Sequence, residues 1–272
     1  MEIISRISKG SKMDQVYIPK KRVGFSIGSY VVVKPLTSEA QAEAVKDKPF
    51  FYNIKNLEPI KIAIISDIFH EVENISEYYE NIIVTGSFLD NGFNFNDVDI
   101  MVIKEGQTSS IEEKQIERNI ENKTGIKPHL ILISHNALLK GLSTDPLYQT
   151  MVSRCVSKKR FVYNVKRELN YKLLDLHLLK SRLLIKNFDV LCGREKYELV
   201  RNVISISLFM ENKRLSKEDI DRRINNLFGE QMDIKIRENM WINKKHFLKK
   251  FSKFYNELFS NIMGGIKHAT KQ

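Results

Sequence analysis

The sequence has little of what marks several protein classes. Its 272 residues include only two cysteines, Cys155 and Cys192, which are too few for a disulfide scaffold and do not have the spacing of a zinc site. Both are flanked by apolar residues, so we expect buried free thiols in a reducing compartment. No apolar run reaches the roughly 20 residues that span a bilayer, and residues 1–11 lack the apolar stretch of a secretory signal. These absences predict a soluble, cytoplasmic protein with no membrane partner.

Negative charge is also scarce. There are 33 Asp and Glu against 44 Lys and Arg, which gives a formal net charge of +11. The excess favours polyanionic partners such as RNA, DNA or nucleotide phosphates, and a general basic bias without a specific partner is the alternative. With 42% hydrophobic residues the chain can build a sizeable core, and its length fits one large domain or a few small ones.

The first 36 residues predict short strands joined by glycine-containing turns. They resemble the AbrB-type swapped-hairpin domain, in which such strands form half of an intertwined dimer. The residues that carry the resemblance are Lys9, Gly10, Ile18, Pro19, Gly28 and Val31 to Val33. It implies a homodimer and possible DNA binding, with candidate phosphate contacts at Arg6, Lys9, Lys12, Lys20, Lys21 and Arg22. The alternative is a small β appendage that packs on the rest of the chain.

Two carboxylates lie in an otherwise apolar part of the chain. Residues 82–84 predict a buried strand, Gly86 and Ser87 break it, and residues 97–103 predict the next strand. Side chains at i and i+2 of a strand point to the same face, so Asp97 and Asp99 project side by side. Adjacent carboxylates in apolar surroundings need a cation between them, and oxygen ligands of this kind suit Mg²⁺. The pair therefore predicts a magnesium site.

The order of these elements resembles the nucleotidyltransferase superfamily typified by DNA polymerase beta, especially its minimal prokaryotic members. The resemblance covers about residues 57–165 and rests on a helix over residues 60–72, a strand, Gly-Ser, a gap of nine residues and Asp-x-Asp. It implies Mg²⁺-dependent (or Mn²⁺-dependent) transfer of a nucleoside monophosphate from an NTP, with ATP expected, to a hydroxyl of RNA, protein or a small molecule. Gly86 would let the triphosphate approach the backbone, Ser87 would bind a phosphate, and the two carboxylates would hold the metal.

The chain departs from the family pattern at one position. The family commonly has a third carboxylate on the next core strand, expected here over residues 128–133, where His129 occupies the matching position. A neutral histidine can act as a base or a metal ligand near physiological pH. Two alternatives remain: catalysis is weakened or lost, or the alignment differs and Asp145 or Asp90 contributes from a loop.

Two basic clusters are weaker candidates. Lys158 and Lys159, followed by Arg160, are candidate nucleotide-binding residues, with a solvated basic loop as the alternative. On a helix expected over residues 243–262, lysines are interleaved with aromatic residues whose spacing is typical of a core face. Those lysines are candidate contacts to a phosphate backbone.

The remaining pattern predicts an α+β fold. In the central part, helices are expected over residues 111–123, 136–142 and 145–152, and a last strand over residues 161–163. Further on, helices are expected from about residue 169 and over residues 196–210, 216–228 and 243–262. We therefore predict a β-rich domain (1–36), a connector (37–56), a nucleotidyltransferase α/β domain with a mixed sheet (57–165) and a helical bundle (166–272). The function expected is nucleotidyl transfer; the alternative is a catalytically impaired protein that senses nucleotide or binds DNA, related to toxin–antitoxin systems.

Overall fold

The computed structural model describes residues 7–8, 15–16, 48–76, 78–93, 95–105, 110–240 and 243–269. The chain divides into two compact units, residues 1–45 and 46–272. In the first, β1 (Ile7–Ser8) pairs antiparallel with β2 (Gln15–Val16). The other residues that suggested an AbrB-type domain lie outside the described residues. That domain, its dimer and its DNA contacts therefore stay predictions, as do the predicted domain boundaries.

A five-stranded mixed sheet is the centre of the second unit, and it confirms the predicted α+β class. Its order is β3-β7-β4-β5-β6, antiparallel throughout except for the parallel pair β5 and β6. The strands are β3 (Phe50–Tyr52), β4 (Asn81–Thr85), β5 (Asp97–Ile103), β6 (Lys127–Ile133) and β7 (Cys155–Ser157). β4 and β5 are central and almost wholly apolar, because helices cover both of their faces.

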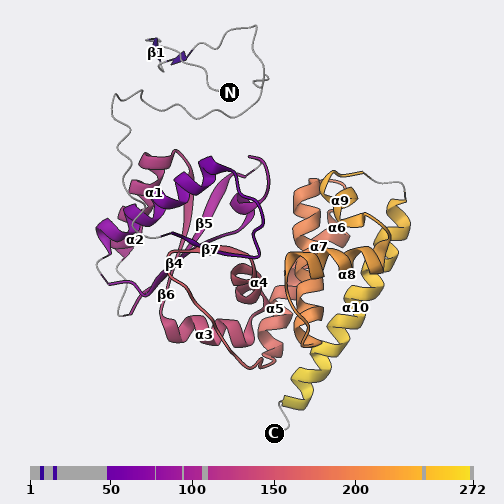
Figure 1. The fold of residues 1–272 in the computed structure, drawn as a ribbon. Helices are drawn as coiled ribbons and strands as arrows, with labels where there is room; N and C mark the ends of the chain where they lie inside the picture. Colours follow the sequence, from indigo (N-terminus) through magenta and orange to yellow (C-terminus); the bar gives the residue numbers. More distant parts are fainter. Residues whose placement is uncertain are drawn as a thin grey trace. The chain divides into compact units, whose positions relative to one another are not determined.

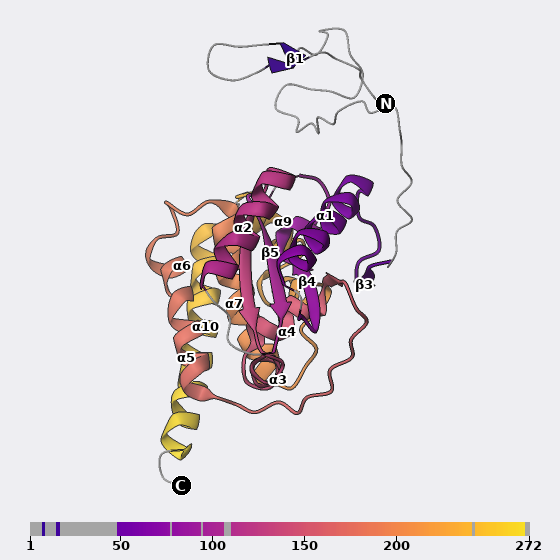
Figure 2. The same cartoon turned by 90° about the vertical axis from the view of Figure 1, so that its left-hand side faces the viewer.

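Alternate residues of the strands face two different helix pairs (Figures 1 and 2). Ile82, Val84 and Ile100 pack with α1 (Pro59–Ile75) and α2 (Ser110–Thr124). Ile83 and Met101 pack on the other side, with α3 (His135–Thr144) and α4 (Pro146–Ser153). The period of two therefore assigns Asp97 and Asp99 to the α3 and α4 face, since they alternate in step with Met101.

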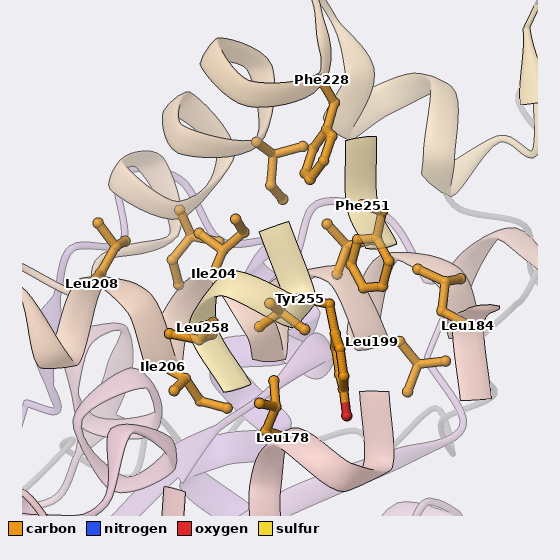
Figure 3. Packing of buried hydrophobic residues seen from close by; sticks show 14 of the residues in the cluster. Leu178, Leu184, Leu199, Ile204, Ile206, Leu208, Phe228, Phe251, Tyr255 and Leu258 are labelled. Atoms are coloured by element: carbon orange, nitrogen blue, oxygen red, sulfur yellow. The ribbon is translucent and has the colours of Figure 1, made fainter. Parts of the chain in front are cut away.

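Helices alone form the C-terminal part, as predicted. They are α5 (Tyr171–Ser181), α6 (Leu183–Lys186), α7 (Gly193–Met210), α8 (Lys217–Phe228), α9 (Met232–Arg237) and α10 (Lys244–Ala269). Figure 3 shows their shared core, in which Phe251, Tyr255 and Leu258 of α10 lie among Leu178 of α5 and Phe228 of α8. The aromatic residues of α10 are thus a core face, and α7 is the buried central helix. No helix in the described part of the chain is long and apolar enough to cross a membrane.

Three expectations are corrected by the structure. The strand predicted over residues 161–163 is wrong: Phe161 stacks on Tyr52 and Tyr163 in an irregular segment, and the strand lies earlier, at Cys155–Ser157. The exposed helix predicted over 111–123 buries Ile116 and Ile120 against the sheet. Cys155 is buried as expected, but Cys192 is exposed, because it precedes the first turn of α7.

Candidate functional site

The carboxylate pair lies where β5 extends beyond the end of β4. Thr85, the last residue of β4, is opposite Asp99 in the antiparallel register, so Asp97 reaches past the strand end towards the loop that follows. The Asp99 side chain is 30% exposed, which leaves its carboxylate accessible to a ligand. The strand end therefore presents both carboxylates on one face beside the Gly86–Ser87 loop.

Gly86 is required at this position by two independent features of the backbone. Its φ is +83°, a conformation that L side chains rarely adopt. A Cβ at this position would collide with Asp99 Oδ2 and lie 3.0 Å from Asp99 Cγ. Ser87 then starts a single 3₁₀ turn (Ser87–Leu89), closed by a 3.0 Å hydrogen bond from Asp90 N to Ser87 O. The loop backbone therefore lies directly against the Asp99 carboxylate.

His129 lies next to Asp99, where the sequence predicted the third acidic position. In the parallel register of β5 and β6, Asp99 is opposite His129 and Asp97 is opposite Lys127. The distance between His129 Nδ1 and Asp99 Oδ1 is 2.9 Å, and the His129 side chain is 65% exposed. Lys127 is also exposed, so β6 borders the carboxylate pair with two basic side chains.

The two other carboxylates considered from sequence have different partners. Asp145 caps α4 by accepting a hydrogen bond from Leu147 N at 2.8 Å, and it lies 3.0 Å from His177 Nε2. Asp90 Oδ1 accepts hydrogen bonds from Arg154 and Lys217, both at 2.6 Å. Burial alone would raise the pKa of Asp90, but the hydrogen bonds and charges of these two cations outweigh it and lower that pKa below its usual value. Neither carboxylate completes a cluster with the pair on β5.

Lys61, which the sequence analysis did not single out, fixes the loop after Ser87. Its side chain is completely buried on α1, and Nζ donates to the carbonyls of Asp90 and of Gly92, the latter at 2.6 Å. Nζ also lies 3.1 Å from Glu58 Oε2 and 5.7 Å from the centre of the Phe88 ring. A sequence signal existed, because Lys61 occupies the buried stripe of α1 with Ile65, Ile68, Phe69 and Val72. A lysine in such a stripe must find acceptors, and here they are loop carbonyls.

The C-terminal helices add a second basic residue to the loop. Arg194, in the first turn of α7, donates a hydrogen bond of 3.1 Å to Ser87 Oγ. Lys217, the first residue of α8, reaches Asp90 in the same loop. The amino-terminal end of an 18-residue helix carries a partial positive charge, so the first turn of α7 adds to that of Arg194. Sequence patterns gave no sign of these contacts, since 107 residues separate Arg194 from Ser87.

Lys158 and Lys159 are not brought to this site. They follow β7 beside the start of β4: Lys158 N donates to Ile82 O, and Lys159 N donates to Asn81 Oδ1, each at 2.9 Å. Ile82 precedes Gly86 by four residues, which in a strand is about 13 Å. The Lys158 side chain instead pairs with Glu73 at 3.2 Å.

The ligands available suit magnesium only if a substrate supplies some of them. Among the described residues, no group of three His, Cys, Asp or Glu side chains could hold a metal ion. Mg²⁺ is commonly bound by one or two carboxylates together with substrate phosphates and water. Asp97 and Asp99 beside a phosphate-sized loop fit that mode, and they do not fit a structural metal site with only protein ligands.

Comparison with protein-family models finds no match, and comparison with curated proteins finds no relative. Among solved structures, the chain is similar to a spectinomycin adenyltransferase from Enterococcus faecialis crystallised with ATP and spectinomycin. The TM-score is 0.44 and the sequence identity 13%, over 75% of this chain and 99% of that one. We infer nothing about activity from a likeness at this level.

Proposed function

We propose that this protein is a nucleotidyltransferase that uses Mg²⁺ or Mn²⁺ and an NTP, with ATP the expected substrate. The observation that carries the proposal is the packing of Gly86 against Asp99, which places a glycine loop with a serine hydroxyl beside two carboxylates on one strand face. Few other chemistries need a phosphate-sized loop at that position.

Each residue of the site then has a defined task. Asp97 and Asp99 hold the divalent ion, which when bound neutralises triphosphate charge and activates the attacking hydroxyl. Ser87 and Arg194 bind the phosphates, because a hydroxyl and a guanidinium converge there and oxyanions accept hydrogen bonds from both. Lys61 keeps the loop in place through the carbonyls of Asp90 and Gly92.

His129 takes the place of a third carboxylate in this proposal. Its Nδ1 contacts Asp99 and orients that carboxylate, while Nε2 is available to hydrogen-bond the acceptor hydroxyl. Together with Lys127 it makes the β6 side of the site basic. An anionic acceptor such as an RNA end suits that side better than a cationic one, because like charges would repel it.

The test is incubation of the full chain with α-³²P-labelled NTPs, Mg²⁺ or Mn²⁺, and either total RNA, a protein lysate or small hydroxyl acceptors. We expect label to appear in one acceptor class and to fall by at least about 1,000-fold in Asp97→Asn, because removing a metal ligand removes most of the charge stabilisation. Asp67→Asn, on α1 and away from the loop, is the matched control and should retain full activity.

The regulator alternative makes the opposite forecast in the same experiment. If the protein only senses nucleotide, NTP binding measured by equilibrium dialysis would be clear while no acceptor is labelled. Retained labelling in Asp97→Asn would contradict the assignment of the carboxylate pair.

A further inference from the structure

Helix α5 is apolar on two opposite faces. Leu174 and Leu178 are completely buried in the core shared with α7 and α10. On the other face Leu176 is 65% exposed, Leu179 58% and Leu183 45%. Arg182 joins α5 to α6 with helical dihedral angles, φ −62° and ψ −22°, so the three leucines continue along one helical path. Single exposed leucines are ordinary, but a row of three with spacings of three and four residues is a seam.

We propose that this leucine seam (Leu176, Leu179 and Leu183) is a dimer interface in which α5 pairs antiparallel with α5 of a second copy. Spacings of three and four residues are those of helices that pack side by side in coiled coils. A seam on one helix that meets its own copy about a two-fold axis makes a closed, self-complementary contact.

The charges beside the seam favour a second copy in the antiparallel direction. In heptad terms Leu176 and Leu183 are a positions, Lys172 and Leu179 are d positions, and Asp175 and Arg182 are the flanking g positions. Antiparallel pairing places Leu176 against Leu179 of the second copy and Asp175 beside its Arg182, twice by symmetry. In a parallel pair Lys172 would instead face its own copy within the seam.

The flanking pair has no competing ion pair within the described part of the chain. The ion pairs found there do not involve Asp175 or Arg182, and both side chains lie near Tyr255 of α10. Their charges are therefore available to a second copy. Because α5 is only about 16 Å long, the interface is smaller than the roughly 800 Å² per partner of a standard complex, and the dimer should dissociate on dilution.

Sedimentation velocity of the full chain across a wide concentration range tests the interface. We expect a concentration-dependent dimer whose dissociation constant rises at least about tenfold in Leu179→Asp, since a buried unpaired charge opposes association. The matched control is Leu147→Asp, at an equally apolar position on α4 that is 46% exposed. That control should leave the dissociation constant unchanged, and far-UV circular dichroism should show both variants folded.

A charge exchange tests the direction of pairing. Asp175→Arg and Arg182→Asp should each weaken the dimer by placing like charges together, and the double variant should restore it. A wild-type chain that stays monomeric, a dimer that survives Leu179→Asp, or a double variant as weak as the single ones would overturn the proposal. Survival in Leu179→Asp would assign the dimer to another surface, such as residues 1–45.

Discussion

The two ends of strand β4 differ in charge and in how their neighbours are held. At the carboxyl end, Gly86 packs against Asp99, and the completely buried Lys61 binds the following loop from behind. At the amino end, Lys159 is exposed, and Asn81 holds its backbone by a 2.9 Å hydrogen bond. The acidic end is therefore preorganised by burial, whereas the basic end is an exposed surface. An excess of charge attracts a substrate, but fixed geometry is what chemistry requires.

The largest expected effect concerns that preorganisation. Lys61→Ala removes two hydrogen bonds to loop carbonyls and a side chain packed among aromatic rings. We expect the free energy of unfolding to fall by about 3 kcal/mol, measured by urea denaturation followed by circular dichroism. Lys55→Ala, an exposed lysine close in sequence, should cost less than about 0.5 kcal/mol. Equal losses in the two variants would mean that Lys61 does not hold the loop.

The next effect separates backbone strain from collision with the carboxylate. Gly86 and Gly92 both have positive φ, +83° and +79°, but a Cβ at Gly92 would meet nothing within 4 Å. Both Gly→Ala changes should lower stability by about 1 kcal/mol. Only Gly86→Ala should also reduce nucleotidyl transfer, by about 100-fold, because it displaces Asp99. A similar loss of transfer in Gly92→Ala would show that loop strain, and not the position of Asp99, sets the rate.

A smaller effect tests the contribution of the C-terminal helices to the acidic end. Arg194→Ala should raise KM for the NTP about tenfold and change kcat little, since a phosphate contact made equally in ground and transition states affects binding. Arg160→Ala, which removes an exposed arginine at the basic end, is the matched comparison and should leave KM for the NTP unchanged. If Arg160→Ala raises that KM as much as Arg194→Ala, the triphosphate binds at the opposite end of the strand from the one proposed.

Local pattern was enough to predict most of the fold and the neighbourhood of the carboxylates. The period of two in residues 97–103 and the Gly-Ser break predicted the two central strands, and the pattern of α1 predicted its helix. The register that brings His129 beside Asp99 follows from strands being laid side by side in a sheet. These features are short-range or set by the strand period, so the sequence contains them.

What the sequence could not indicate depends on long-range packing. Arg194 reaches Ser87 only because α7 lies beside the loop, and no local pattern encodes that. The strand expected over residues 161–163 failed for a related reason: its aromatic residues were read as a strand face, whereas Phe161 is occupied in a stack with Tyr52 of β3. The basic residues 158–160 were assigned to the nucleotide because charge in a sequence does not say at which end of a strand it will lie.

The smallest expected effect decides whether the basic end takes any part in nucleotide binding. The double change Lys158→Ala and Lys159→Ala should alter KM for the NTP by less than about twofold, since both lysines lie about 13 Å along β4 from Gly86. Stability should fall by no more than about 1 kcal/mol, because the only ion pair lost is the partly exposed one between Lys158 and Glu73. Initial rates over a range of NTP concentrations measure the first quantity, and urea denaturation the second. If KM for the NTP is unchanged but KM for a nucleic-acid acceptor rises, the basic end binds the acceptor, and the two ends of β4 divide the substrates between them. If KM for the NTP itself rises tenfold, the strand ends have been assigned the wrong way round.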